Sequence, residues 1–108
     1  MRWTMLAIPL PGMAMAEDWK TLTGPEITAA LTARVVQYDG EHRQDFMADG
    51  RTLYDESRGS WRVEGDQFCS QWPPSDRWTC YGVAARGLDL RFIAADGSET
   101  QGRYADLR

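Results

Sequence analysis

The sequence predicts an α+β domain in which a short N-terminal helix packs on an antiparallel β-meander. Three observations support this fold class. A capping box precedes an apolar stripe of helical spacing, turn dipeptides recur through the rest of the chain, and two cysteines bracket one hairpin. The runs between the turns correspond to seven or eight short strands, which form either an open curved sheet or a small closed barrel.

Residues 1–16 have the features of an export signal. A basic residue, Arg2, precedes an apolar run that ends in Ala14-Met15-Ala16, a cleavage site of the A-x-A type. The run is shorter than the roughly 20 residues that a membrane-spanning helix needs. We therefore expect cleavage before Glu17, with residues 17–108 forming a single periplasmic or secreted domain that has no membrane anchor after cleavage.

The size and charge of the mature chain limit its partners. The whole chain has 16 acidic and 12 basic residues, and loss of Arg2 with the leader changes the formal net charge from −4 to about −5. Such a surface repels phosphate backbones and anionic membranes. We expect no nucleic-acid partner, and instead a protein, a peptide or a small apolar ligand.

The helix is predicted from its start signal. Thr23 and Glu26 form a capping box, and Pro25 lies in the first turn, where it costs no hydrogen bond. An apolar stripe then follows at helical spacing, formed by Ile27, Ala30 and Leu31. The pattern predicts an amphipathic helix over about residues 24 to 33 that packs on one face of the sheet.

From Arg34 onward, apolar and polar residues alternate between regularly spaced turn signals. The turn dipeptides are Asp39-Gly40, Asp49-Gly50, Gly65-Asp66, Arg86-Gly87 and Asp96-Gly97. Two-residue turns at the third and fourth of these fix the register of two hairpins. The predicted cross-strand pairs are Val63 with Phe68, Trp61 with Ser70, Val83 with Leu90, and Tyr81 with Phe92. Both registers place apolar residues on one face, as a half-buried sheet requires.

Cys69 and Cys80 are predicted to form a disulfide across one hairpin. With the two cysteines opposite each other, the bridge lies on the face away from the helix, near Arg62 and Trp78. A bridge that closes a loop of this length adds about 3 kcal/mol in the chain-entropy model. A metal site is disfavoured because ten residues separate the cysteines and His42 is the only histidine of the chain.

Three segments of the chain resemble a group of small, uncharacterised exported proteins of proteobacteria. The segments are Ala48-Asp49-Gly50-Arg51-Thr52-Leu53-Tyr54, Gly59-x-Trp61-x-Val63-x-Gly65-Asp66-x-Phe68-Cys69-Ser70-x-Trp72-Pro73-Pro74, and Trp78-x-Cys80-Tyr81-x-Val83. The resemblance covers about residues 19 to 95. It implies the fold and the periplasmic compartment and carries over no catalytic residues. The Gly59-x-Trp61 strand start is also similar to lipocalin-type barrels.

Motifs for catalysis are weak in this sequence. A nucleophile-histidine-acid arrangement would have to use His42, which lies in a predicted exposed turn. A carboxylate pair for a hydrolase could be drawn from Asp45, Asp55, Glu64, Asp66 and Asp76. We find neither a phosphate-binding glycine loop nor a dinucleotide fingerprint. The sequence therefore favours a non-enzymatic protein without a cofactor, catalytic residues or a metal.

The tip of the cysteine hairpin is the strongest candidate binding site. It contains Trp72, Pro73, Pro74, Arg77 and Trp78. Large stiff side chains lose little entropy on contact, so this composition is typical of a binding hot spot. Alternatively, the two tryptophans pack across the hairpin and cover the disulfide.

Three functions remain open from the sequence. The first is a binding or interaction module that uses the aromatic hairpin or the concave sheet face. The second is a lipocalin-like carrier of a small apolar ligand, which requires an interior cavity of about 300 Å³ or more. The third is an envelope hydrolase that uses a carboxylate pair.

Overall fold

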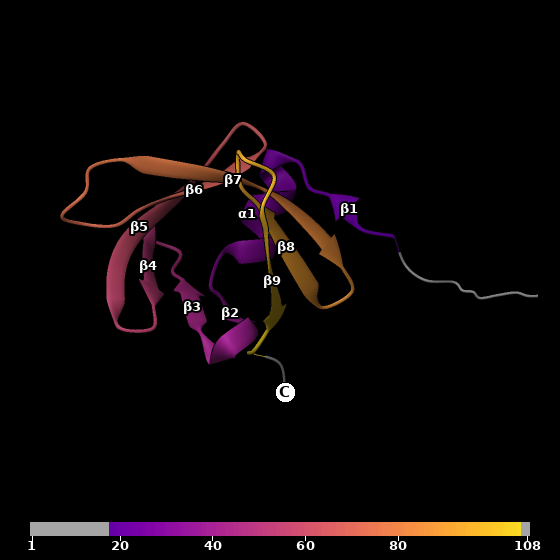
Figure 1. Cartoon of the computed structure of the whole chain (residues 1–108), viewed down its shortest axis with the longest axis horizontal. Helices are drawn as coiled ribbons and strands as arrows, with labels where there is room; N and C mark the ends of the chain where they lie inside the picture. Colours follow the sequence, from indigo (N-terminus) through magenta and orange to yellow (C-terminus); the bar gives the residue numbers. More distant parts are fainter. Residues whose placement is uncertain (1–17, 107–108) are drawn as a thin grey trace, which may run out of the picture.

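The computed structural model describes residues 18–106, so the predicted export signal lies outside the described part (Figure 1). The described chain forms one α-helix and nine strands. They are β1 (Lys20–Thr21), α1 (Gly24–Leu31), β2 (Arg34–Tyr38), β3 (Arg43–Phe46), β4 (Arg51–Tyr54), β5 (Ser57–Glu64), β6 (Gln67–Gln71), β7 (Trp78–Arg86), β8 (Asp89–Ile93) and β9 (Glu99–Tyr104), with a short 3₁₀ turn at Asp39–Glu41 between β2 and β3.

Strands β2 to β9 form a closed antiparallel barrel. Each strand pairs with the next along the chain, and β9 returns to pair with β2, where Val36 lies opposite Tyr104. Strand β1 is additional and pairs with β7 through Lys20 and Ala85. Of the two predicted architectures the closed barrel is therefore present, and the domain is mostly β. The strand count exceeds the predicted seven or eight because β1 lies outside the barrel.

One of the two predicted hairpin registers is confirmed and the other is wrong. In the β5–β6 hairpin, Val63 lies opposite Phe68, as predicted. In the β7–β8 hairpin the turn is one residue later than predicted, and Arg86 remains in the ladder opposite Asp89. Gly87 takes the turn conformation instead, with φ of 60°, which glycine adopts without steric cost.

The register error leaves the inward face unchanged. Val83 pairs with Phe92, and Ala85 pairs with Leu90. Each partner is displaced by two residues from the predicted pairing. Because side chains alternate with a period of two, such a shift keeps the same residues inside the barrel.

The capping box at the start of α1 is confirmed. The backbone N–H of Glu26 donates to Thr23 Oγ1 at 3.4 Å, and the N–H of Thr23 donates to Glu26 Oε1 at 2.9 Å. The helix ends at Leu31, two residues before the predicted end. Thr32 is already extended, and Ala33 has φ of 60°, so the chain turns sharply here into β2.

The helix lies at one end of the barrel, because the sheet on which it was expected to pack closes on itself. The N–H of Gly24 donates to Asp66 Oδ1 in the β5–β6 turn at 2.7 Å. The hydroxyl of Tyr104 in β9 donates to the helix backbone at 2.7 Å. Ile27 and Leu31 are fully buried among the inward side chains of the strands. In Figure 1 the helix is seen behind the ring of strands. No helix within residues 18–106 is long and apolar enough to cross a membrane.

The predicted disulfide joins β6 and β7 on the outer wall of the barrel. Cys69 and Cys80 lie directly opposite each other, with a Cα–Cα distance of 4.0 Å. Arg62 lies opposite Cys69 on β5, and its guanidinium stacks 3.9 Å above the ring of Trp78. The predicted neighbours of the bridge are therefore confirmed.

Candidate ligand-binding cavity in the barrel mouth

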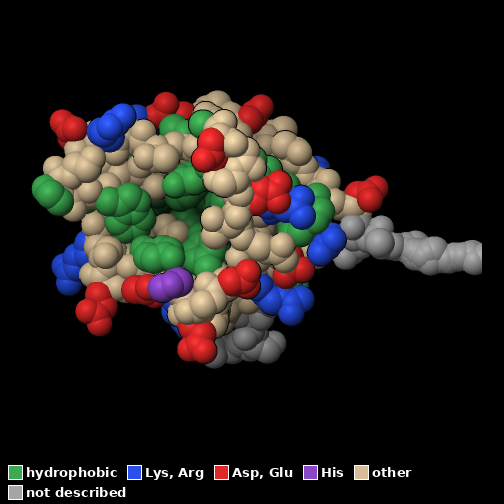
Figure 2. Space-filling view, viewed as in Figure 1, with side chains coloured by type: hydrophobic (Ala, Val, Ile, Leu, Met, Phe, Trp, Pro, Cys, Tyr) green, Lys and Arg blue, Asp and Glu red, His purple; other side chains and the backbone are tan. Residues whose placement is uncertain are grey.

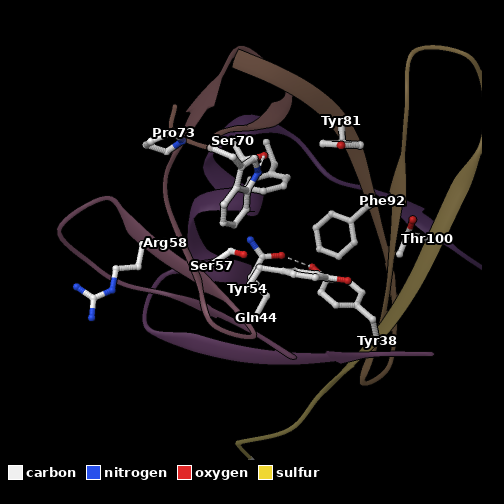
Figure 3. A pocket seen from close by; sticks show the side chains of 12 residues that line it. Tyr38, Gln44, Tyr54, Ser57, Arg58, Ser70, Pro73, Tyr81, Phe92 and Thr100 are labelled. Atoms are coloured by element: carbon white, nitrogen blue, oxygen red, sulfur yellow. Dashed lines mark hydrogen bonds between the residues drawn. The ribbon is translucent and has the colours of Figure 1, made fainter. Parts of the chain in front are cut away.

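The end of the barrel opposite the helix contains a cavity of about 520 Å³ (Figure 3). The β5–β6 turn lies at the helix end, whereas the cavity opens between the loops at the other end of β6 and extends inward to Phe68. Its lining residues are Tyr38, Gln44, Tyr54, Ser57, Arg58, Phe68, Ser70, Trp72, Pro73, Tyr81, Phe92 and Thr100. This volume exceeds the value of about 300 Å³ that a carrier of a small apolar ligand requires.

Six aromatic side chains form a nearly continuous belt around this cavity. The ring centroids of neighbours along the belt are 5.6 to 6.2 Å apart. In order, the belt runs Trp72, Tyr54, Tyr38, Phe92, Phe68 and Tyr81. The residues come from five different strands and one loop, and all six point inward. Phe68 lies nearest the helix end, where it contacts Phe46 of the core. We refer to these six residues as the aromatic belt.

A buried chain of hydrogen bonds fixes one side of the belt. The Tyr38 hydroxyl donates to Gln44 Oε1 at 2.7 Å, Gln44 Nε2 donates to Thr52 Oγ1 at 2.9 Å, and the Thr52 hydroxyl donates to the carbonyl of Asp45 at 2.7 Å. Desolvation raises the pKa of Tyr38 well above its ordinary value, so its hydroxyl stays neutral. This side of the cavity is therefore polar, uncharged and held in place.

Trp72 is held over the mouth by two features of neighbouring strands. Its indole N–H donates to Ser70 Oγ at 3.1 Å. Its ring lies across Gly59 of β5, where a Cβ atom would be 2.6 Å from the indole and 2.5 Å from the carbonyl oxygen of Gln71. Only glycine leaves room for the indole here. The glycine of the Gly59-x-Trp61 pattern thus serves the cavity, while Trp61 itself is buried in the core.

The five residues of the predicted hairpin tip are divided between two faces of the barrel wall. Trp72 and Pro73 line the cavity. Pro74 and Arg77 are exposed in the β6–β7 loop, and Trp78 lies on the outer wall beside the disulfide. The structure therefore does not bring the five residues together, and the two indoles do not pack against each other across the hairpin.

The carboxylates considered for a hydrolase are also dispersed. Glu64 and Asp66 lie at the helix end of the barrel, and Asp45 lies on the outer wall between two inward residues of β3. Asp55 and Asp76 lie in separate loops at the mouth. Within residues 18–106, no group of three or more histidine, cysteine and acidic side chains could hold a metal ion.

His42 is exposed, as predicted for a turn residue, but it has specific partners. Its Nδ1 lies 2.8 Å from Asp55 Oδ2, and its ring stacks on Tyr54 of the aromatic belt with centroids 5.6 Å apart. The hydrogen bond from His42, together with one from the N–H of Arg43, lowers the pKa of the Asp55 carboxyl. His42 therefore supports the rim of the cavity from outside.

Most of the cavity residues were not among the site residues predicted from the sequence. Tyr38, Gln44, Tyr54 and Thr100 lie in four strands that are distant in sequence, and no local motif connects them. The one feature that these four residues share is their position, since each is an inward residue near the same end of its strand. That shared position can be recognised only when the ends of the hairpins and the closure of the barrel are known.

Comparisons with known proteins add no functional assignment. The chain matches no protein-family model, no curated protein and no solved structure. The resemblance to lipocalin-type barrels and to small exported proteins of proteobacteria therefore stays a prediction.

Proposed function

We propose that this is an exported, non-enzymatic binding protein that holds a small ligand in the mouth of its barrel. The cavity of about 520 Å³ supports the proposal, because ligand pockets have volumes of roughly 300 to 1,000 Å³ and are lined mainly by apolar and aromatic side chains with a few polar groups. The cavity favours the carrier over recognition by the hairpin tip, since Trp72 faces inward. An extracytoplasmic location agrees with the disulfide between Cys69 and Cys80.

The polar groups of the cavity can orient a ligand by forming hydrogen bonds to it. Gln44, Ser70 and Tyr38 are neutral. Hydrogen bonds between Tyr38, Gln44 and Thr52 hold the first and the last of these in place, and Ser70 Oγ accepts a hydrogen bond from the indole of Trp72. A fixed hydrogen-bonding group loses little freedom when a ligand binds, and this increases affinity. A ligand with an apolar body and one polar end fits such a lining.

Binding can be tested with N-phenyl-1-naphthylamine, a neutral dye whose fluorescence rises in apolar sites. We expect saturable binding by the mature protein. Thr100 lines the cavity, whereas the next residue, Gln101, points to the outside of the same strand. Thr100→Trp should therefore weaken dye binding by about tenfold or more, and Gln101→Trp should leave it unchanged. Absence of saturable binding, or equal binding by the two variants, would contradict the proposal.

A further inference from the structure

We propose that the ligand is an organic cation, such as a quaternary ammonium compound, held by the faces of the aromatic belt. The inference rests on the proposed function and specifies the chemistry of the ligand. Two independent features of the structure carry it, namely the π-rich wall of the cavity and the distribution of carboxylates around its mouth.

The wall of the cavity presents a high density of aromatic rings. The belt contains three tyrosines, two phenylalanines and one tryptophan, with neighbouring centroids no more than 6.2 Å apart. The face of an aromatic ring carries partial negative charge and attracts a cation within about 6 Å of the centroid. A cation that enters this cavity lies close to several aromatic rings at once. The attraction is strongest where water is excluded, as in quaternary ammonium sites of other proteins.

The loops around the mouth carry an excess of negative charge. The four connections at this end of the barrel span residues 39–42, 55–56, 72–77 and 94–98. Their acidic residues are Asp39, Glu41, Asp55, Glu56, Asp76 and Asp96. The arginines at this end are Arg77 within the loops and Arg43 and Arg58 at the starts of the adjoining strands, so acidic residues remain in excess. Figure 2 views a hollowed face with hydrophobic side chains inside it, and both acidic and basic side chains around it. Charges of one sign around a low-dielectric cleft raise the local concentration of the opposite ion.

The hairpin loops at the opposite end of the barrel carry fewer acidic residues. Its three hairpin connections span residues 47–50, 65–66 and 87–88, and their acidic residues are Asp49 and Asp66. Asp66 accepts a hydrogen bond from the start of α1, and Asp49 is paired with Arg51. The negative charge of the hairpin loops is thus concentrated at the open end, where a ligand enters.

Arg58 is the one charged residue among the described residues that line the cavity, and it could favour an anion instead. Its side chain is exposed, and Figure 3 shows the guanidinium pointing away from the aromatic belt. The surface that faces the interior therefore consists of neutral hydroxyl and amide groups and aromatic rings. This arrangement favours the cation over an anion of the same shape.

Three molecules of similar shape and different charge test the proposal directly. They are choline, the neutral 3,3-dimethylbutan-1-ol and the anionic 3,3-dimethylbutanoate, each measured by displacement of N-phenyl-1-naphthylamine from the mature protein. We expect choline to displace the dye at a concentration at least about tenfold below that of the alcohol, because only choline gains the cation–π attraction. The anion should be the weakest.

Two tryptophans of the same hairpin provide a matched pair of variants. Trp72 belongs to the belt, whereas Trp78 lies on the outer wall against Arg62. Trp72→Leu should weaken choline binding by about tenfold while changing that of the alcohol by less than about twofold, because leucine keeps the apolar contact without the π face. Trp78→Leu should change neither. Binding of the alcohol and the dye by each variant verifies that the cavity is intact.

The possible outcomes separate the two proposals. Equal displacement by choline and the alcohol would overturn the cation proposal while leaving the cavity as a ligand site. Tighter binding of the anion would also overturn it and would indicate that Arg58 turns inward. A failure of the dye to bind at all would overturn the proposed function itself.

Discussion

The two ends of the barrel are built from the same strands and have opposite properties. In β2, Val36 is fully buried in the core, whereas Tyr38, two residues further, lies at the border between the core and the cavity. In β3, Phe46 belongs to the core and Gln44 to the cavity. α1 fills one end with apolar side chains, while the aromatic belt at the other end borders an open cavity.

The difference between the two ends shows that the alternation of inward and outward side chains along a strand is not enough to predict which residues form a site. A period of two decides whether a side chain faces the interior or the solvent. Position along the strand then decides whether an inward residue supports folding or is available to a ligand. Whether an inward residue belongs to the core or borders the cavity thus depends on which end of the barrel the helix closes. The position of the helix depends in turn on contacts such as the hydrogen bond between Gly24 and Asp66.

The largest expected effect is at the helix end. Ile27 is fully buried, and Ile27→Ala should lower the free energy of unfolding by about 4 kcal/mol, as is usual for truncation of a large core side chain. Tyr81→Ala at the mouth should cost no more than half of this, because Tyr81 already borders solvent. Urea unfolding of both variants measures the difference. Equal losses would show that the mouth is as tightly packed as the core.

The disulfide tests whether the mouth hairpin needs a covalent constraint. Cys80→Ser should lower the free energy of unfolding by about 3 kcal/mol without reductant, because the bridge closes a loop of twelve residues counting both cysteines. In strong reductant, the variant and the parent should unfold at nearly the same denaturant concentration. Identical unfolding curves without reductant would mean that the bridge contributes nothing to stability.

A smaller effect is expected from crowding the indole that covers the mouth. A Cβ atom at Gly59 would collide with Trp72 and with the backbone of Gln71, so Gly59→Ala should cost about 2 kcal/mol and displace the indole. Dye affinity should fall several-fold, and tryptophan emission should shift to longer wavelength. Gly82→Ala is the matched control, since a Cβ at Gly82 is 4.0 Å from its nearest neighbour. A similar result for both variants would show that Gly59 has no special role.

The smallest effect is the pH dependence of the helix cap. The hydrogen bond from Lys20, followed by that from the N–H of Thr23, lowers the pKa of Glu26 from 4.5 to about 2. A carboxyl with a depressed pKa stabilises the fold above its unfolded pKa and loses that contribution as the pH falls toward 2. Glu26→Gln should therefore show a slightly flatter decline of stability than the parent between pH 4.5 and 2 in acid titrations. An unchanged slope would indicate that this exposed cap does not contribute.

Features that depend on residues close together in the chain could be predicted without the structure. The capping box of Thr23 and Glu26 fixed the helix start, because its hydrogen bonds connect residues three apart. The Gly65-Asp66 turn fixed the β5–β6 register and, with it, the face that carries Cys69. The β7–β8 register was wrong by two residues, since Arg86-Gly87 and Gly87-Leu88 are both plausible turns when only apolar pairing is considered.

The closure of the sheet and the set of residues that form the cavity depend on contacts between distant segments, and could not be predicted from local patterns. Closure places Val36 of β2 beside Tyr104 of β9, two strands at opposite ends of the domain sequence. The belt likewise joins Tyr38 to Phe92 across the barrel interior. Each strand contributes only one or two residues to the cavity, so no local segment contains the pattern of the site. The site exists because the barrel closes and α1 fills one end of it, and both events depend on packing between segments that are far apart in the chain.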